Sequence, residues 1–168
     1  MALITQPLRD EHKGLLPKIE LLKATADAIA EGPTAPFAQA VEGAYHFLMG
    51  HLLPHAKAED KALYPVVAKV MGSPKATMTM SRDHAEVERL IEALERLLPG
   101  VQGKALNKSD AISLRRVLYG LHAIIKLHFA KEEEVYLPLL DASLNAAEAK
   151  AMFAAMHMAA DEAGAHHH

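Results

Sequence analysis

The stretch HAKAEDKALYP, residues 55–65, decides the fold, because a second copy of it, HFAKEEEVYLP, occupies residues 128–138. Both copies read His-x-x-x-Glu, through His55 and Glu59 in the first and His128 and Glu132 in the second, and both carry a proline six residues after the glutamate. Residues four apart lie on one face of an α-helix, so each copy directs an imidazole and a carboxylate to one place. Two such helices that face each other would surround a small volume with metal-binding groups.

The composition favours a single helical domain. The 168 residues are enough to bury a real core, and alanine and leucine dominate a chain that is 51% hydrophobic and only 5% aromatic. The formal net charge of −3 gives no basic surface for a nucleic acid. The absence of cysteine excludes disulfides and thiolate metal sites.

No segment of the sequence indicates a membrane or an export signal. Apolar runs fall short of the ~20 residues that a membrane span needs. The N-terminus lacks the basic start, apolar stretch and small-residue site of a secretory signal. We therefore expect a cytoplasmic protein without a membrane partner.

Apolar residues at helical spacing predict helices at about residues 7–31, 36–70, 74–98, 109–138 and 145–163. The short connections favour an antiparallel up-down-up-down four-helix bundle with an additional C-terminal helix. That last helix carries an apolar stripe that should pack over an open edge of the bundle. Alternatively, the stripe forms a dimer contact. The stripes of the other helices include Leu16, Ile112 and Val135.

Prolines and capping residues predict where the helices bend and end. Pro54 and Pro65 should bend the second helix, and Pro138 should end or kink the fourth. We expect these further signals: Ser73 and Pro74 opening the third helix, Pro99-Gly100 ending it, Ser109 or Asp110 capping the fourth, and a capping box from Asn145 to Glu148 opening the last.

A tandem repeat explains the two copies. His55 and His128 are 73 residues apart, as are Glu59 and Glu132, while His12 precedes His84 by 72 residues. The chain therefore reads as two helical hairpins, each of which presents one histidine and then one His-x-x-x-Glu. Paired about a pseudo-twofold axis, the hairpins would bring four imidazoles and two carboxylates to the centre.

A structural interpretation of these residues competes with a metal site. A single histidine on an apolar face is ordinarily a satisfied core residue, and a single His-x-x-x-Glu pair arises by chance or at a surface. Two copies with matched spacing, each preceded by a histidine in its partner helix, favour the metal site. Burial of four imidazoles and two carboxylates without a partner would also be costly, and a metal supplies the positive charge.

The order His, His-x-x-x-Glu, His, His-x-x-x-Glu with trailing prolines resembles the hemerythrin-like proteins, or HHE cation-binding domains, from His12 to Pro138. The resemblance implies a bundle that holds two iron ions with an oxo or hydroxo bridge; manganese and zinc rank behind iron. The ligand set that it implies is His12, His55, Glu59, His84, His128 and Glu132. Both glutamates would bridge, with the first two histidines on one iron and the last two on the other.

Three further residues are candidates for an additional ligand or a pocket position. Glu88 stands one turn after His84, where the oxygen carriers of the family have a fifth histidine, so the carrier pattern is not met; its alternative is a solvated glutamate. His51 lies one turn before His55, and Tyr45 is a pocket or core residue. We expect these histidines to be structural or exposed: His46, His122 and His157.

Other metal-binding classes fit less well, because the Glu-x-x-His pairs of ferritin-like proteins and the His-Glu-x-x-His of zincins are absent. Residues 1–163 then form one hemerythrin-like domain, and residues 164–168 form a tail that ends in what looks like a tag remnant. We expect a monomer or weak homodimer that binds or senses oxygen, nitric oxide, peroxide or iron. The alternative is a catalase-like enzyme that degrades peroxide.

Overall fold

Residues with strong helical preference build a nearly continuous series of helices in the computed structural model, which describes residues 3–165. The α-helices are α1 (Gln6–Ala28), α2 (Ala38–Phe47), α3 (Leu53–Ala58), α4 (Tyr64–Val70), α5 (Met78–Gln102), α6 (Lys108–Lys131), α7 (Leu137–Ser143) and α8 (Ala146–Ala165). The molecule is therefore all-α, as the sequence predicts. None of these described helices combines the length and apolar character of a membrane span.

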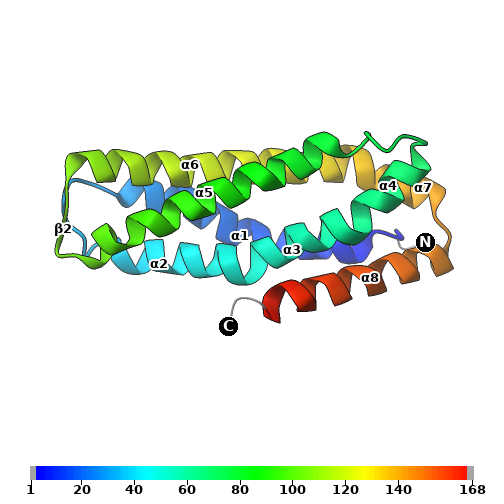
Figure 1. Ribbon diagram of the computed structural model, residues 1–168, viewed down its shortest axis with the longest axis horizontal. Helices are drawn as coiled ribbons and strands as arrows, with labels where there is room; N and C mark the ends of the chain where they lie inside the picture. Colours follow the sequence, from blue (N-terminus) through cyan, green and yellow to red (C-terminus); the bar gives the residue numbers. More distant parts are fainter. Residues whose placement is uncertain (1–2, 166–168) are drawn as a thin grey trace.

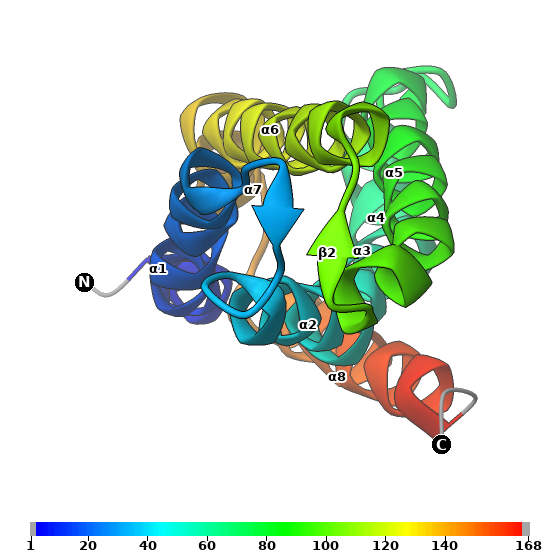
Figure 2. The same ribbon diagram turned by 90° about the vertical axis from the view of Figure 1, so that its left-hand side faces the viewer.

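The long helices lie side by side and reverse direction along the chain (Figure 1). Seen from the end, α1, α6, α5 and α2 surround a common interior, and α8 lies outside it against α3 (Figure 2). A short antiparallel ladder of β1 (Gly32–Pro33) and β2 (Ala105–Leu106) crosses the end of the molecule farthest from α7. The ladder ties the first interhelical connection to the third.

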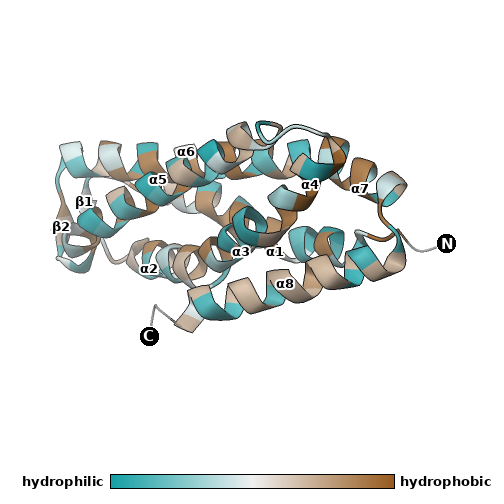
Figure 3. Cartoon of the chain, turned by 45° about the vertical axis from the view of Figure 1, so that its right-hand side comes forward, coloured by the Kyte–Doolittle hydropathy of each residue, from teal (hydrophilic) through white to brown (hydrophobic). Residues whose placement is uncertain are grey.

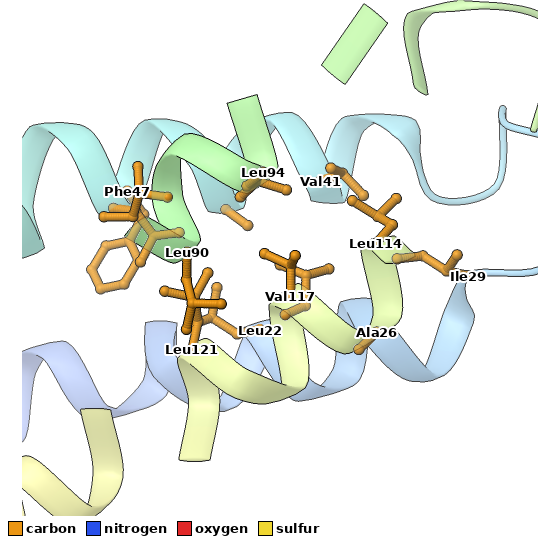
Figure 4. Close-up of a cluster of buried hydrophobic side chains, with 14 of the residues drawn as sticks. Leu22, Ala26, Ile29, Val41, Phe47, Leu90, Leu94, Leu114, Val117 and Leu121 are labelled. Atoms are coloured by element: carbon orange, nitrogen blue, oxygen red, sulfur yellow. The ribbon is translucent and has the colours of Figure 1, made fainter. Parts of the chain in front are cut away.

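Two apolar clusters fill the interior between the helices. The larger lies towards the β1–β2 end, where residues such as Leu22, Leu94 and Leu121 interlock (Figure 4). The smaller joins the start of α1 to α4, α7 and α8 through Leu8, Leu63 and other side chains. Hydrophilic and apolar residues alternate along the helices, as expected when one face of each is buried (Figure 3).

Three π-helical segments interrupt the α-helices, each just before a proline: η1 (Leu48–Leu52), η2 (Glu59–Leu63) and η3 (Glu132–Tyr136). In η2 the Tyr64 N–H donates to the Glu59 carbonyl, and in η3 the Leu137 N–H donates to that of Glu132. A proline has no N–H and crowds the carbonyl four residues before it, and a wider turn relieves both problems. The helices thus continue through Pro54, Pro65 and Pro138 by widening.

Several predicted helix ends are wrong. Helix α5 does not end at Pro99-Gly100 but runs on to Gln102, because Val101 packs fully buried in the larger apolar cluster. Helix α5 also does not open at Ser73 and Pro74; it begins at Met78, and the Ser73 hydroxyl instead accepts a local bond from the Lys75 N–H.

The predicted cap of α6 is wrong, whereas the predicted capping box of α8 is confirmed. The cap of α6 is Asn107, whose side chain accepts from the Asp110 N–H at 2.9 Å, and not Ser109 or Asp110. The capping box of α8 is confirmed, because the Asn145 side chain accepts from the Glu148 N–H and the Glu148 side chain accepts from the Asn145 N–H, both at 3.0 Å.

The burial of some apolar residues also departs from the helical stripes. Leu16, Ile112 and Val135 are 37%, 48% and 54% exposed. Each lies at the edge of the apolar face of its helix, and other apolar residues of that face are buried in its place. Helix α8 extends to Ala165, two residues beyond the predicted end of the domain, and the predicted tag remnant, 166–168, lies outside the described residues.

Candidate metal centre

Six polar side chains from four long segments of the chain meet between the two apolar clusters. His12 comes from α1, His84 from α5, and the two His-x-x-x-Glu copies from α3–η2 and α6–η3. All six are buried, and both glutamates are 0% exposed. The wide turns that begin at Glu59 and Glu132 hold these residues at the point where the helices face one another.

One group of candidate ligands consists of His12, His55, Glu59 and Glu132. One atom from each lies within 4.8 Å of the others. The His55 Nε2 lies 2.9 Å from Glu59 Oε1, and the His12 Nε2 lies 3.4 Å from Glu132 Oε2. Two imidazole nitrogens and two carboxylate oxygens thus converge on one small volume.

The second group consists of Glu59, His84 and His128, within the same 4.8 Å limit. The His84 Nε2 lies 3.3 Å from Glu59 Oε2 and 3.0 Å from the His128 Nε2. Glu132 reaches this group as well, since its Oε1 lies 3.4 Å from the His128 Nε2. Each glutamate therefore presents one oxygen to each pair of histidines.

Four carboxylates behind the imidazoles fix the orientation of these rings. The His12 Nδ1 lies 2.8 Å from Glu133, and the His84 Nδ1 lies 2.8 Å from Asp60. The equivalent contacts for the other two rings are His55 Nδ1 to Glu11 at 3.0 Å and His128 Nδ1 to Asp83 at 3.1 Å. An imidazole that donates its Nδ1–H to a carboxylate presents its Nε2 as a metal ligand, which is the usual arrangement in metalloproteins.

These four carboxylates are not among the residues predicted from the sequence, although the sequence contains a signal for them. In each repeat an acidic residue precedes the first histidine, as Glu11 and Asp83, and another follows the glutamate, as Asp60 and Glu133. Neighbouring residues on a helix point about 100° apart. An acidic residue beside a ligand can therefore serve the histidine of an adjacent helix.

The buried carboxylates and imidazoles of the cluster shift one another's pKa values. Burial opposes ionisation of Glu59, but His55, His12 and His128 outweigh it and hold the pKa of this carboxyl well below its usual value. Burial likewise opposes protonation of His128, yet its contacts with Glu132 and Glu59 raise its pKa to about 10. The same balance raises the pKa of His55 and of His84. The neighbouring carboxylates therefore favour the protonated forms of His55, His84 and His128.

Two features of these six residues suit a metal ion: several of their buried polar atoms lack a hydrogen-bond partner, and their donor atoms are of the types that metals bind. Among the buried side chains of residues 3–165, Arg9 Nε and five atoms of this cluster have no hydrogen-bond partner. The five are His12 Nε2, His55 Nε2, both oxygens of Glu59 and Glu132 Oε2. Buried polar atoms are seldom left without a partner, and these point into the spaces that the two groups enclose. Imidazole nitrogens and carboxylate oxygens together suit iron, manganese or zinc.

Tyr64 is a further residue of the site that was not predicted from the sequence. It is 2% exposed, and its hydroxyl donates to Glu132 Oε1 at 2.7 Å while lying 3.0 Å from the His128 Nε2. Burial, together with the charges of Glu59 and Glu132, raises the pKa of this phenol far above its usual value.

Only one of the two tyrosines in the repeats reaches the site. Leu137 holds the position in the second copy that corresponds to Tyr64, five residues after the glutamate. The tyrosine of the second copy, Tyr136, instead donates to the Ala76 carbonyl at 3.2 Å. The centre is therefore asymmetric, with a phenol only beside His84 and His128.

The three additional candidates do not join the cluster. His51 is exposed and stacks on Phe47, Glu88 is exposed and lies 3.8 Å from Lys57, and the Tyr45 hydroxyl donates to Glu95 at 3.0 Å. The histidines expected off the ligand register also lie apart from it: His46 and His157 are exposed, and His122 lies 3.1 Å from Glu20.

An apolar pocket of about 20 Å³ borders the centre. It is lined by Glu59, three of the histidines and apolar side chains that include Leu52, Val87 and Ile125. This volume holds about one water-sized molecule. The walls thus admit a very small ligand to the region between the two groups and leave little room for bulk water.

Comparison with known proteins gives one match. The sequence pattern described as the hemerythrin HHE cation binding domain matches residues 3–140. No curated protein and no solved structure shows a significant match. The matched range contains the six candidate ligands and the four carboxylates behind them, and it ends before α8 begins at Ala146.

Proposed function

The chain belongs to the hemerythrin HHE cation-binding family, and we propose that it holds two iron ions in the two groups of ligands. The observation that carries the proposal is the shared Glu59, whose two oxygens lie one in each group. Glu132 presents its oxygens in the same way, so both carboxylates would bridge. His12 and His55 would hold one ion, and His84 and His128 the other.

The packing of the helices supports an antiparallel up-down-up-down four-helix bundle as the frame of this centre. Helices α1, α2, α5 and α6 pack against one another in a closed order, and the chain reverses at each connection. Rigid helical segments that carry the ligands hold them in place more accurately than loops do. The added helix α8 covers the outside of α3.

The function we propose is the binding or sensing of a small molecule of the size of oxygen, nitric oxide or peroxide. Two irons in this place would supply positions at which such a molecule binds and exchanges electrons. The chain contributes an apolar pocket of about 20 Å³, which selects very small ligands and leaves little room for bulk water. Glu88, at the position of the fifth histidine of oxygen carriers, is exposed and pairs with Lys57, which argues against reversible oxygen transport.

Peroxide degradation is a second candidate function, and Tyr64 favours it. Disproportionation of two peroxide molecules into oxygen and two water molecules requires protons to move between oxygen atoms. The Tyr64 hydroxyl is a buried proton donor that contacts Glu132 and His128 at the edge of the centre. A donor held at this point could transfer or hold a proton beside a bound ligand.

Titration of the iron-loaded protein separates the two candidates. For a sensor, we expect nitric oxide added without oxygen, or peroxide, to change the optical spectrum up to a stoichiometric end point. Oxygen evolution that continues over many equivalents of peroxide would support the enzyme instead. No spectral change with either reagent would refute both functions while leaving the metal content to be judged separately.

A further inference from the structure

A second cavity, of about 190 Å³, lies between α1, α3 and α8 on the outer side of His55. Its walls are mainly apolar and include Leu8, Ala58 and Met156, while Glu11 supplies a carboxylate and His55 and His157 supply imidazoles. Because α8 lies beyond the matched family range, this helix adds one wall to a cavity that the family domain would leave open. Cavities of roughly 150 Å³ with apolar walls accept a molecule the size of benzene.

Glu11 differs from the other carboxylates that hold an imidazole. Each of the other three has a second partner: Glu133 pairs with Arg9, Asp83 with Lys131, and Asp60 with the Ser81 hydroxyl. Glu11 has a 50% exposed side chain and contacts His55, but no lysine or arginine of residues 3–165 pairs with it. Glu11 also lines the cavity, so its carboxylate is available there to a cationic ligand.

The internal repeat shows what is missing beside Glu11. Under the pseudo-twofold relation Glu11 corresponds to Asp83, since each directly precedes the first histidine of its repeat. The lysine that pairs with Asp83 is Lys131, three residues after His128. The corresponding residue, three after His55, is Ala58, which lines the cavity. In the first repeat, a methyl group and an open space thus replace a lysine side chain.

We propose that this cavity binds a small organic ammonium ion, whose charged group takes beside Glu11 the place that the Lys131 ammonium takes beside Asp83. The apolar body of the ligand lies against Leu8 and Met156. Phe153 also lines the cavity, and the face of an aromatic ring attracts a cation. A primary amine on a single ring or a short branched chain fits the volume. The site needs no metal, and its occupant would contact the carboxylate that orients His55.

Binding of benzylammonium tests the proposal, with benzyl alcohol and benzoate as neutral and anionic molecules of the same shape. For this test, the methionine methyl groups are labelled with ¹³C, and the affinity for each probe is measured by NMR titration. Met156 lines the cavity, whereas Met158 on the same helix is 67% exposed and serves as an internal reference. We expect benzylammonium to shift the Met156 signal and not that of Met158. It should bind about tenfold more tightly than benzyl alcohol, because a charge-assisted hydrogen bond is the difference.

Two variants test whether the Glu11 carboxylate binds the ammonium group. Glu11→Gln keeps the shape of the side chain and should weaken benzylammonium binding about tenfold, while Glu92→Gln on the exposed face of α5 should leave it unchanged. Ala58→Lys builds the missing ammonium into the chain and should abolish binding; if this variant does not fold, Glu11→Gln decides alone. Equal affinity for the three probes, no binding, or an unchanged affinity in Glu11→Gln would overturn the proposal. Metal content measured on the same samples separates this failure from a failure of the iron centre.

Discussion

Glu59 is the residue that both ligand groups share, so its side chain tests whether they form one centre. Glu59→Gln keeps the size of the side chain but removes the charge that draws metal to both groups. We expect both irons to be weakened together, with metal content falling well below that of the parent protein in elemental analysis. Glu92→Gln, on an exposed glutamate of α5, should keep the parent content. A Glu59→Gln protein with two irons and an unchanged optical spectrum would show that Glu59 is not a bridge.

Tyr64 and Tyr136 form a matched pair for testing the asymmetry of the centre. Tyr64→Phe removes the hydroxyl that donates to Glu132, and a buried acceptor that loses its partner costs about 1–3 kcal/mol. We expect a lower melting temperature for the metal-free protein and an altered optical spectrum for the iron-loaded one. Tyr136→Phe removes only a bond to the Ala76 carbonyl and should leave the spectrum unchanged. The same spectrum for Tyr64→Phe as for the parent would place the phenol outside the centre.

Much of the candidate site could be predicted at the scale of single residues. Helical spacing alone brings His55 and Glu59 to one face, and the repeat adds their counterparts. Tyr64 could not be chosen over Tyr136, because which ring points inward depends on the wide turn before each proline. Glu11 was missed although it stands beside a ligand in the sequence, because it lies on a different face of its own helix and contacts His55 on a neighbouring one.

The elements themselves were largely predictable, because long amphipathic patterns and short connections leave few alternatives. The π-helical segments were not, since a pattern averaged over a helix does not reveal one widened turn. Pro54, Pro65 and Pro138 predict a disturbance, but only packing decides between a bend and a widened turn. The same holds at Pro99, where burial of Val101 extends α5 past a residue that ordinarily ends a helix.

The cap of α6 allows the structure to be tested against the sequence pattern at the scale of one element. Asn107→Ala removes the side chain that accepts from the Asp110 N–H, and loss of such a cap costs about 0.5–2 kcal/mol. Ser109→Ala, at the position that the pattern favoured, should change the free energy of unfolding by less than about 0.5 kcal/mol. Chemical denaturation of the two variants measures both values. The reverse order of effects would mean that Ser109, and not Asn107, caps α6.

At the scale of the whole molecule, the protonation of the cluster predicts a different pH dependence for the metal-free and the metal-loaded protein. The pKa of His128 is raised to about 10 in the folded chain, against an ordinary value of about 6.5. Its contribution to stability is therefore complete below pH ~6.5 and is lost as the pH rises through about 10. The metal-free protein should melt at progressively lower temperature over this range.

Metal binding requires neutral imidazoles and releases their protons, so the stabilisation by metal should grow over the same range. Thermal melts of both forms at several pH values measure the two trends. A melting temperature of the metal-free protein that stays constant or rises towards pH 10 would contradict the charge balance described for His128, Glu59 and Glu132.

The metal content of the protein tests the central claim most directly. Protein isolated in air after growth with iron is freed of loosely bound metal and analysed for iron, manganese and zinc per chain. The two ligand groups that share Glu59 predict two metal ions per chain, with iron in excess of the others. One ion per chain at full occupancy, or zinc alone, would contradict a di-iron centre between His12, His55, His84 and His128.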